Sequence, residues 1–307
     1  MREVITHINK GADSPARVLP PERKPLRIAA IQEPWHGSVE KQKSEISDAV
    51  LAASEFAPDL IILTELSLYP YACTRPDAQA NFIPELVDKD GMSVSFAADL
   101  ARSSGAHVLI SLYEDAGDQH FNTAVTVAPN GEIVLKTRKT HIPVTAGYYE
   151  DKYFAQGDSS PAIAQIKEAL VGTPTCWDQW FPELAREYGL INTDLLCYPT
   201  AIGSEPDHPD FDTEPLWRQM MIAHGIANGL FVAAVNRTGT EDGITFYGSS
   251  FISDPYGRVL ARAGSAGSAV LVADLDLDQK RDWLTLFPFF KTRRPSMYQN
   301  INKTDNN

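Results

Sequence analysis

The chain has 307 residues, of which 43% are hydrophobic and 22% charged, as is typical of a globular protein with one large α/β domain or two average ones. Its 27 basic and 40 acidic residues give a formal charge of -13, which argues against nucleic acid or an anionic membrane as a partner, because both bind clustered Lys and Arg. Three cysteines without metal-type or redox spacing argue against a disulfide framework and a zinc site, and they indicate a reducing compartment.

The ends of the chain carry little hydrophobic pattern. No stretch reaches the roughly 18 apolar residues of a membrane span, and the N-terminus lacks the apolar core of a signal peptide, so we expect a cytoplasmic protein. Residues 1–25 mix charges, glycine and prolines without periodicity, which predicts an arm or flexible leader rather than a packed element. Because no internal linker follows, residues 26–300 are expected to form one domain, with a short tail at 301–307.

Two β-α-β units are predicted in the first part of this domain. Apolar runs and helical spacing predict strands at 26–32, 60–66 and 107–114 and helices at 39–56 and 93–104. The second helix is expected to be capped by Ser93 and ended by Gly105. Glu65 stands where the second strand leaves the core, a place where a carboxylate is either merely solvated or functional.

A hairpin and a long loop follow. The turn Asn130-Gly131 joins two apolar arms, which is a strong hairpin signal. The second arm ends at Lys139 and leads into a loop, rich in aromatic and turn residues, that contains His141 and Glu150. Lys139 is either a solvated residue at a strand end or a functional one, and His141 is either structural or catalytic.

Cys176 stands at a strand-to-helix corner. Residues 170–175 have the length of a buried strand, and residues 182–189 predict a helix with proline in its first turn. The free N–H groups and the dipole at a helix start favour a thiolate, which is the nucleophilic form of cysteine. The alternative is that Cys176 is an unreactive, buried small hydrophobe.

The rest of the domain predicts more strands and one long helix. The strands are expected at 194–201, 230–236, 248–254, 258–263 and 269–276, and the helix at 213–228. Asp212 is expected to cap this helix, and Gly229 to end it. The segment from Arg281 onward is rich in aromatic residues, so it is expected to pack on this subunit or on a neighbour.

Four residues, Glu65, Lys139, Glu150 and Cys176, together supply the side chains that cysteine-mediated acyl transfer requires. A carboxylate such as Glu65 serves as general base for Cys176, whose thiol is otherwise only a few per cent ionised near neutral pH. The ammonium of Lys139 and the backbone N–H of Trp177 stabilise the oxyanion of a tetrahedral intermediate. A second carboxylate, Glu150, holds the lysine and orients the hydrolytic water.

Several motifs, in order, resemble the nitrilase, or carbon-nitrogen hydrolase, superfamily over about residues 26–300. They are TEL around Glu65, RKTHIP around Lys139, GYYEDKYFAQGD around Glu150, CWDQWFPE from Cys176 and YPTAIGSEP up to Pro206. The resemblance implies a four-layer αββα sandwich and dimers that extend it across a shared face. It also implies a site without metal or organic cofactor, in which Cys176 is the nucleophile, Glu65 the base, Lys139 the oxyanion-stabilising cation and Glu150 the auxiliary acid.

Within the superfamily, CWDQWFPE, YPTAIGSEP, ITFYGSSF and RRPSMY most resemble the N-carbamoylputrescine amidases. This implies a small-molecule substrate, an N-carbamoyl amine, that is cleaved to amine, carbon dioxide and ammonia through a thioester. Members acting on N-carbamoyl D-amino acids carry arginines where this chain has Gln179 and Trp180. The acidic residues Asp178, Glu205 and Asp207 suit an amine tail better, unless they are only surface charge. The expected substrate-binding residues are Trp177, Asp178, Glu205, His141, Tyr71, Tyr148 and Thr200.

Two alternatives remain open at this point. In the first, the same mechanism serves an N-carbamoyl amino acid such as N-carbamoyl-β-alanine, a simple amide or a nitrile. In the second, the fold survives as a non-enzymatic scaffold. A scaffold would be free to lose the nucleophile or its partners, and all four are present in this chain.

Overall fold

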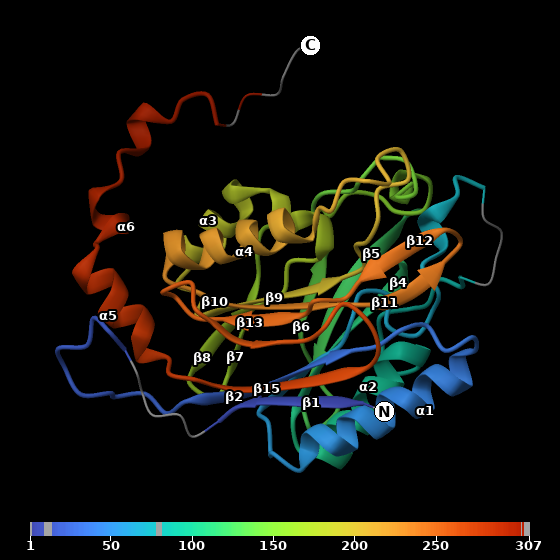
Figure 1. Ribbon diagram of the computed structural model, residues 1–307, viewed down its shortest axis with the longest axis horizontal. Coiled ribbons are helices and arrows are strands. Elements are labelled where there is room, and N and C mark those ends of the chain that lie inside the picture. The colour runs from blue at the N-terminus through green and yellow to red at the C-terminus, as the bar shows by residue number, and fades with distance from the viewer. Residues whose placement is uncertain (1, 9–13, 78–81, 302, 304–307) are drawn as a thin grey trace.

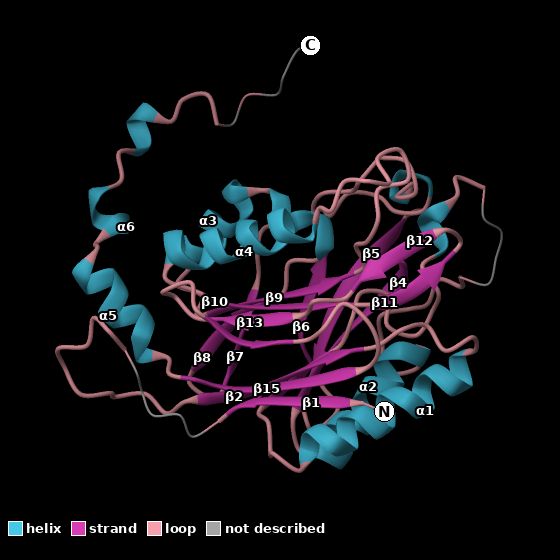
Figure 2. Ribbon diagram, viewed as in Figure 1, coloured by secondary structure: helices cyan, strands magenta, loops and turns pink. Residues whose placement is uncertain are grey.

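Two mixed β-sheets lie face to face in the centre of the molecule, and a pair of helices covers the outer face of each (Figures 1 and 2). The computed structural model describes residues 2–8, 14–77, 82–301 and 303. Helix, sheet, sheet and helix therefore form four layers, which confirms the predicted αββα sandwich.

The first sheet has seven strands, which lie in chain order except that the last described strand of the chain is inserted between the first two. In spatial order they are β1 (Glu3–His7), β15 (Ala269–Leu275), β2 (Leu26–Gln32), β3 (Leu60–Ile62), β4 (His107–Asp115), β5 (His120–Val127) and β6 (Ile133–Arg138). The strands β2, β3 and β4 run parallel, as the two predicted β-α-β units require, and β5 and β6 form the predicted antiparallel hairpin.

The second sheet has six strands, and a small two-stranded sheet stands beside it. In spatial order the six are β14 (Val259–Arg262), β13 (Phe251–Ser253), β10 (Phe231–Asn236), β9 (Leu195–Thr200), β8 (Ala169–Gly172) and β7 (Ile163–Ile166). The small sheet pairs β11 (Thr238–Glu241) with β12 (Ile244–Tyr247). Sequence patterns did not predict β1, β7, β11 or β12, which are all short.

The helices divide between the two outer faces and the C-terminal segment. They are α1 (Val39–Ser54) and α2 (Met92–Ser104) on the first sheet, α3 (Pro182–Leu190) and α4 (Glu214–Asn228) on the second, and α5 (Asp278–Leu286) and α6 (Phe289–Thr292) towards the C-terminus. The described residues also form four 3₁₀ turns: η1 (Ala72–Thr74), η2 (Glu150–Lys152), η3 (Cys176–Trp180) and η4 (Pro295–Met297). No helix of the described segments is both long enough and apolar enough to cross a membrane.

Three apolar layers hold the sandwich together. The middle layer packs the facing sides of the sheets against each other, with Leu26 and Ile28 from β2 and Leu195 and Phe231 from the second sheet. The outer layers pack α1 and α2 on one side and α3 and α4 on the other. Because β-strands alternate their side chains, residues of opposite parity in β2 and β9 serve different layers.

Several details of the sequence prediction were wrong, among them the cap of α4, which is Thr213 rather than Asp212. The N-terminal arm is not simply a flexible leader: β1 pairs in parallel with β15, and its arginines meet carboxylates of the domain, as in the 2.6 Å pair between Arg17 and Asp276. Ser93 does not cap α2, because the cap residue is Gly91 and both the N–H and the hydroxyl of Ser93 donate to the carboxylate of Glu85. The tail at 301–307 lies mostly outside the described residues.

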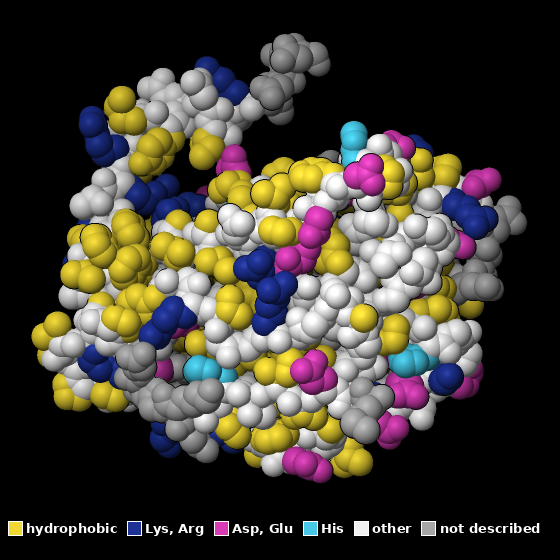
Figure 3. All heavy atoms as spheres, in the orientation of Figure 1, with side chains coloured by type: hydrophobic (Ala, Val, Ile, Leu, Met, Phe, Trp, Pro, Cys, Tyr) yellow, Lys and Arg dark blue, Asp and Glu magenta, His cyan; other side chains and the backbone are white. Residues whose placement is uncertain are grey.

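The C-terminal segment leaves the body of the sandwich after α5 (Figure 1). Apolar residues at the end of α5 and beyond it remain exposed to solvent. The exposed fraction is 57% for Leu286, 64% for Met297 and 57% for Ile301. The segment still touches its own domain, because the guanidinium of Arg186 lies over the ring of Phe290. Figure 3 shows hydrophobic side chains, in yellow, along a segment that stands apart from the main body.

Candidate active site

Glu65, Lys139 and Glu150 meet at one edge of the first sheet, where β3 and β6 end and η2 begins. The Nζ atom of Lys139 lies 2.9 Å from Oε1 of Glu65 and 2.8 and 2.6 Å from the two carboxylate oxygens of Glu150. All three side chains are buried. The structure therefore brings together residues that are 74 and 11 positions apart in the chain.

Burial and opposite charges compete at this ion cluster. Burial disfavours the ammonium, but the charges of Glu150 and Glu65 outweigh it and hold the pKa of Lys139 well above its usual value. Burial also raises the pKa of Glu150 above that of an ordinary carboxyl group, although Lys139 acts in the opposite direction. The hydroxyl of Tyr71 donates to Oε1 of Glu150 over 2.7 Å, so Glu150 is held from two sides.

Cys176 is the first residue of η3, and its backbone has a positive φ of 40°. Non-glycine residues seldom adopt this conformation, and strained backbones of this kind concentrate at functional sites. The thiol is buried and lies 3.9 Å from the carbonyl oxygen of Ala201.

Cys176 does not lie directly at the start of an α-helix, which was the feature expected to favour a thiolate. Burial, followed by the negative charge of Glu65, raises the pKa of the Cys176 thiol well above its ordinary value, although Lys139 acts in the opposite direction. Cys176 begins a short 3₁₀ turn inside the protein, whereas the longer helix α3 starts only at Pro182. The thiol therefore needs a base at the moment of reaction.

A cavity of about 260 Å³ opens onto Cys176 and Glu150. Its other described lining residues are Pro143, Thr145, Tyr148, Trp177, Trp180, Ala201, Ile202, Glu205, Phe211, Thr213 and Leu216. Apart from the two glutamates the wall is largely apolar and aromatic. The size suits a small molecule that carries a few polar groups.

Three of the expected substrate-binding residues line this cavity. Trp177 follows the cysteine directly, and the hydroxyl of Tyr148 accepts the N–H of Gly203 at 2.9 Å. Glu205 accepts a hydrogen bond of 3.4 Å from the hydroxyl of Thr213, and burial raises the pKa of its carboxyl group above the ordinary value. Glu205 therefore presents a half-buried carboxylate to the space beside Cys176.

Four other expected substrate-binding residues are not among the described lining residues of this cavity, and their polar atoms are engaged by the protein. The carboxylate of Asp178 accepts backbone N–H groups of Thr175 at 3.0 Å and of His141 at 2.9 Å. The ring of His141 lies 2.8 Å from Asp178 and stacks on Phe181. The hydroxyl of Thr200 donates to the carbonyl of Tyr198, and Tyr71 contacts Glu150.

Sequence reasoning missed two groups of residues near the cluster. The buried guanidinium of Arg237 donates to the carbonyls of Glu65, Leu66 and Tyr69, and so holds the turn that follows β3. The side-chain amide of Asn122 on β5 donates to Glu65 over 2.7 Å. An asparagine inside a strand whose other polar residues are a histidine and two threonines was the signal that could have singled out Asn122.

The cluster does not have the composition of a metal centre. Within the described ranges, no group of three or more His, Cys, Asp or Glu side chains is placed to hold a metal ion. The lysine ammonium already occupies the space between the two carboxylates.

A two-sheet sandwich that carries a cysteine beside a buried lysine and two carboxylates defines a hydrolase that acts on carbon-nitrogen bonds other than peptide bonds. Comparison with known families agrees: the model for "Carbon-nitrogen hydrolase" matches residues 27–284. The chain belongs to this family, within the nitrilase superfamily, and is an amidohydrolase.

Relatives and solved structures cover almost the whole chain. The N-carbamoylputrescine amidase of Solanum lycopersicum is 35% identical and is aligned over 89% of this chain and 94% of its own length. A citrullinase from Francisella tularensis is 33% identical, over 90% of this chain and 98% of its own. The crystal structure of a carbon-nitrogen hydrolase from Helicobacter pylori G27 superposes with a TM-score of 0.85 at 30% identity, covering 91% of this chain and 99% of that one.

Proposed function

We propose that this amidohydrolase cleaves N-carbamoyl amines, with N-carbamoylputrescine as its first candidate substrate. One observation carries the proposal: the carboxylate of Glu205 lies on the wall of the cavity that holds Cys176, and none of its described lining residues is a lysine or arginine. An ammonium at the far end of the substrate would pair with Glu205, whereas a carboxylate there would meet like charge. The relatives named N-carbamoylputrescine amidase support the same choice.

The proposed chemistry begins with Cys176 and Glu65. Glu65 removes the thiol proton as Sγ attacks the ureido carbon, and the developing oxyanion is stabilised by the ammonium of Lys139 and the backbone N–H of Trp177. Collapse of the tetrahedral intermediate breaks one carbon-nitrogen bond. The leaving nitrogen takes the proton from Glu65, and the acyl group remains on Sγ as a thioester.

Hydrolysis then regenerates the enzyme. Glu65 takes a proton from a water molecule that Glu150 helps to orient, and the resulting hydroxide attacks the thioester carbon. The carbon-sulfur bond breaks, and the proton returns to Sγ of Cys176. The released carbamic acid or carbamate decomposes to carbon dioxide and the second amine, so one water molecule is consumed and putrescine, carbon dioxide and ammonia are formed.

A ureido amino acid is the second candidate. The citrullinase relative supports citrulline, which carries an ammonium that Glu205 could accept as well as a carboxylate. N-carbamoyl-β-alanine, which has only the carboxylate, is disfavoured by the acidic wall. Simple amides and nitriles would fit the cavity but would bring no cation to pair with Glu205.

Ammonia release from a panel of these compounds tests the proposal. We expect kcat/KM for N-carbamoylputrescine to exceed that for N-carbamoyl-β-alanine by at least about tenfold, the lower end of a charge-assisted hydrogen bond. Intact-protein mass spectrometry on rapidly quenched samples should detect an acyl adduct on Cys176. A preference for the carboxylate-bearing substrate would overturn the amine assignment, and the absence of turnover on every compound would favour a scaffold.

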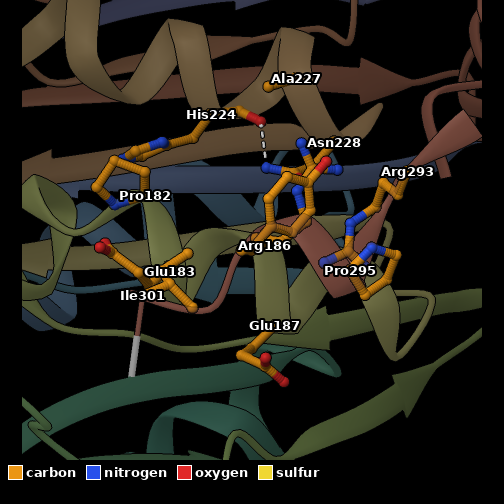
Figure 4. A pocket seen from close by; sticks show the side chains of 11 residues that line it. Pro182, Glu183, Arg186, Glu187, His224, Ala227, Asn228, Arg293, Pro295 and Ile301 are labelled. Atoms are coloured by element: carbon orange, nitrogen blue, oxygen red, sulfur yellow. Dashed lines mark hydrogen bonds between the residues drawn. The ribbon is translucent and has the colours of Figure 1, made fainter. Parts of the chain in front are cut away.

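We also propose that the chain acts in the cytoplasm as a homodimer or larger assembly, with residues 26–300 as the catalytic domain. The exposed apolar residues of the C-terminal segment support self-association, because isolated proteins seldom leave such surface uncovered. A hollow of about 520 Å³ lies between this segment and helices α3 and α4. Figure 4 shows this hollow, with Arg186 from α3 facing Arg293 and Pro295 of the segment.

A further inference from the structure

The two oxygens of the Glu65 carboxylate have different surroundings. Oε1 accepts hydrogen bonds from Nζ of Lys139 at 2.9 Å and from Nδ2 of Asn122 at 2.7 Å. Oε2 is buried and has no hydrogen-bond partner among the described residues. A buried polar atom without a partner costs free energy, so its persistence calls for an explanation.

We propose that Asn122 is a positioning residue that, together with Lys139, occupies one oxygen of Glu65 and so leaves Oε2 as the single proton acceptor. This inference rests on the proposed role of Glu65 as the base for Cys176. A carboxylate whose Oε1 is held by two donors cannot rotate about its last bond without losing both. The free oxygen is thereby kept in one orientation before any substrate arrives.

Asn122 is itself held by the neighbouring strand. Its Oδ1 atom accepts the hydroxyl of Ser111 on β4 at 3.3 Å, and the same hydroxyl oxygen accepts the N–H of Leu66 at 3.0 Å. Both side chains are buried. The orientation of Asn122 is therefore tied to the backbone of the residue that follows Glu65.

The backbone of Asn122 also contacts the backbone of Lys139. Its carbonyl oxygen accepts the N–H of Lys139 at 2.8 Å, while its side chain donates to Glu65. One residue of β5 thus holds the carboxylate through its side chain and the lysine through its main chain. Substitution of the side chain removes only the first of these links, which makes the proposal testable.

The test measures alkylation of Cys176 by iodoacetamide, followed by mass spectrometry, in the full-length protein. Asn122→Leu removes the amide and keeps the branching of the side chain, although leucine is the larger residue. Because a positioned general base contributes about 100-fold or more, we expect Asn122→Leu to slow alkylation about 10- to 100-fold and Glu65→Gln to slow it about 100-fold. In the Glu65→Gln background, Asn122→Leu should change the rate by no more than about twofold, because residues acting as a unit are not additive.

Thr126→Val is the matched control. Thr126 lies on the same strand and is buried, and its hydroxyl has no hydrogen-bond partner among the described residues. Its replacement removes a polar atom from β5 without touching Glu65. The alkylation rate of this variant should equal that of the wild type.

Each outcome decides between the proposals. An equal effect of Asn122→Leu with and without Glu65 would assign Asn122 a purely structural role and overturn this inference, as would an unchanged rate in the single variant. An unchanged rate in Glu65→Gln would instead refute the base role of Glu65. If Asn122→Leu does not fold, Ser111→Ala provides the same test: it removes the hydroxyl that orients Asn122, and we expect about a threefold to tenfold slowing that also disappears in the Glu65→Gln background.

Discussion

Replacing Glu205 by glutamine removes one negative charge from the cavity wall and keeps the shape of the side chain. Among the described residues this carboxylate accepts a hydrogen bond from the Thr213 hydroxyl, at a long 3.4 Å, so it retains hydrogen-bonding capacity for a substrate. A hydrogen bond to a charged group contributes about 1.5 to 3 kcal/mol, which corresponds to roughly a factor of 10 to 150 in kcat/KM. We expect a loss of that size for N-carbamoylputrescine, mainly through KM.

The assay compares this variant with Asp178→Asn on two substrates. Because Asp178 accepts N–H groups of the loop before Cys176 and of His141, its neutralisation should lower kcat for N-carbamoylputrescine and N-carbamoyl-β-alanine alike and should lower the melting temperature. Glu205→Gln should leave N-carbamoyl-β-alanine unchanged or improve it. Equal losses on both substrates in Glu205→Gln would refute the reasoning, because an anchor for an ammonium cannot affect a substrate that has none.

The acidity of Glu205 adds a pH dependence. Burial raises the pKa of its carboxyl group above the ordinary value, so protonation begins at a higher pH than for a solvated glutamate. As the pH falls through this raised pKa, the carboxylate is lost and KM for N-carbamoylputrescine should rise. In Glu205→Gln the same acid branch of the KM profile should be flat.

Three further predictions concern the cluster and the assembly. Cys176→Ala should abolish turnover, whereas Cys73→Ala and Cys197→Ala, at buried sites outside the cavity, should remain active. Ammonia release by Cys176→Ala would refute the proposed mechanism. Glu65→Gln and Lys139→Ala should each lower kcat by about 100- to 1,000-fold, and Lys139→Ala should also lower the melting temperature, because two buried carboxylates lose their cation. Deletion of residues 288–307 should weaken self-association, and a native mass of 33.8 kDa for the intact chain at micromolar concentration would contradict the dimer.

The sequence by itself determined the main elements and proposed the four residues of the site. Apolar runs predicted the strands, although β3 ends at Ile62 rather than at residue 66, so Glu65 follows it by three residues, whereas Lys139 follows β6 directly. The resemblance of the motifs to one superfamily then implied the four layers and the family, both of which the fold and the comparisons confirm. Short strands such as β1 and β11 were not predicted, because a few residues carry too little periodicity to be recognised.

Only the tertiary structure decided which polar side chains face the cavity. Asp178 and Glu205 are both acidic residues near the cysteine motifs in the sequence. In the structure Asp178 accepts hydrogen bonds from backbone N–H groups, whereas Glu205 lines the cavity. Asn122 meets Glu65 because β4 and β5 bring residues 57 positions apart into contact. The physical reason is that patterns along a chain report burial, whereas the partner of a buried polar atom depends on how separate strands pack.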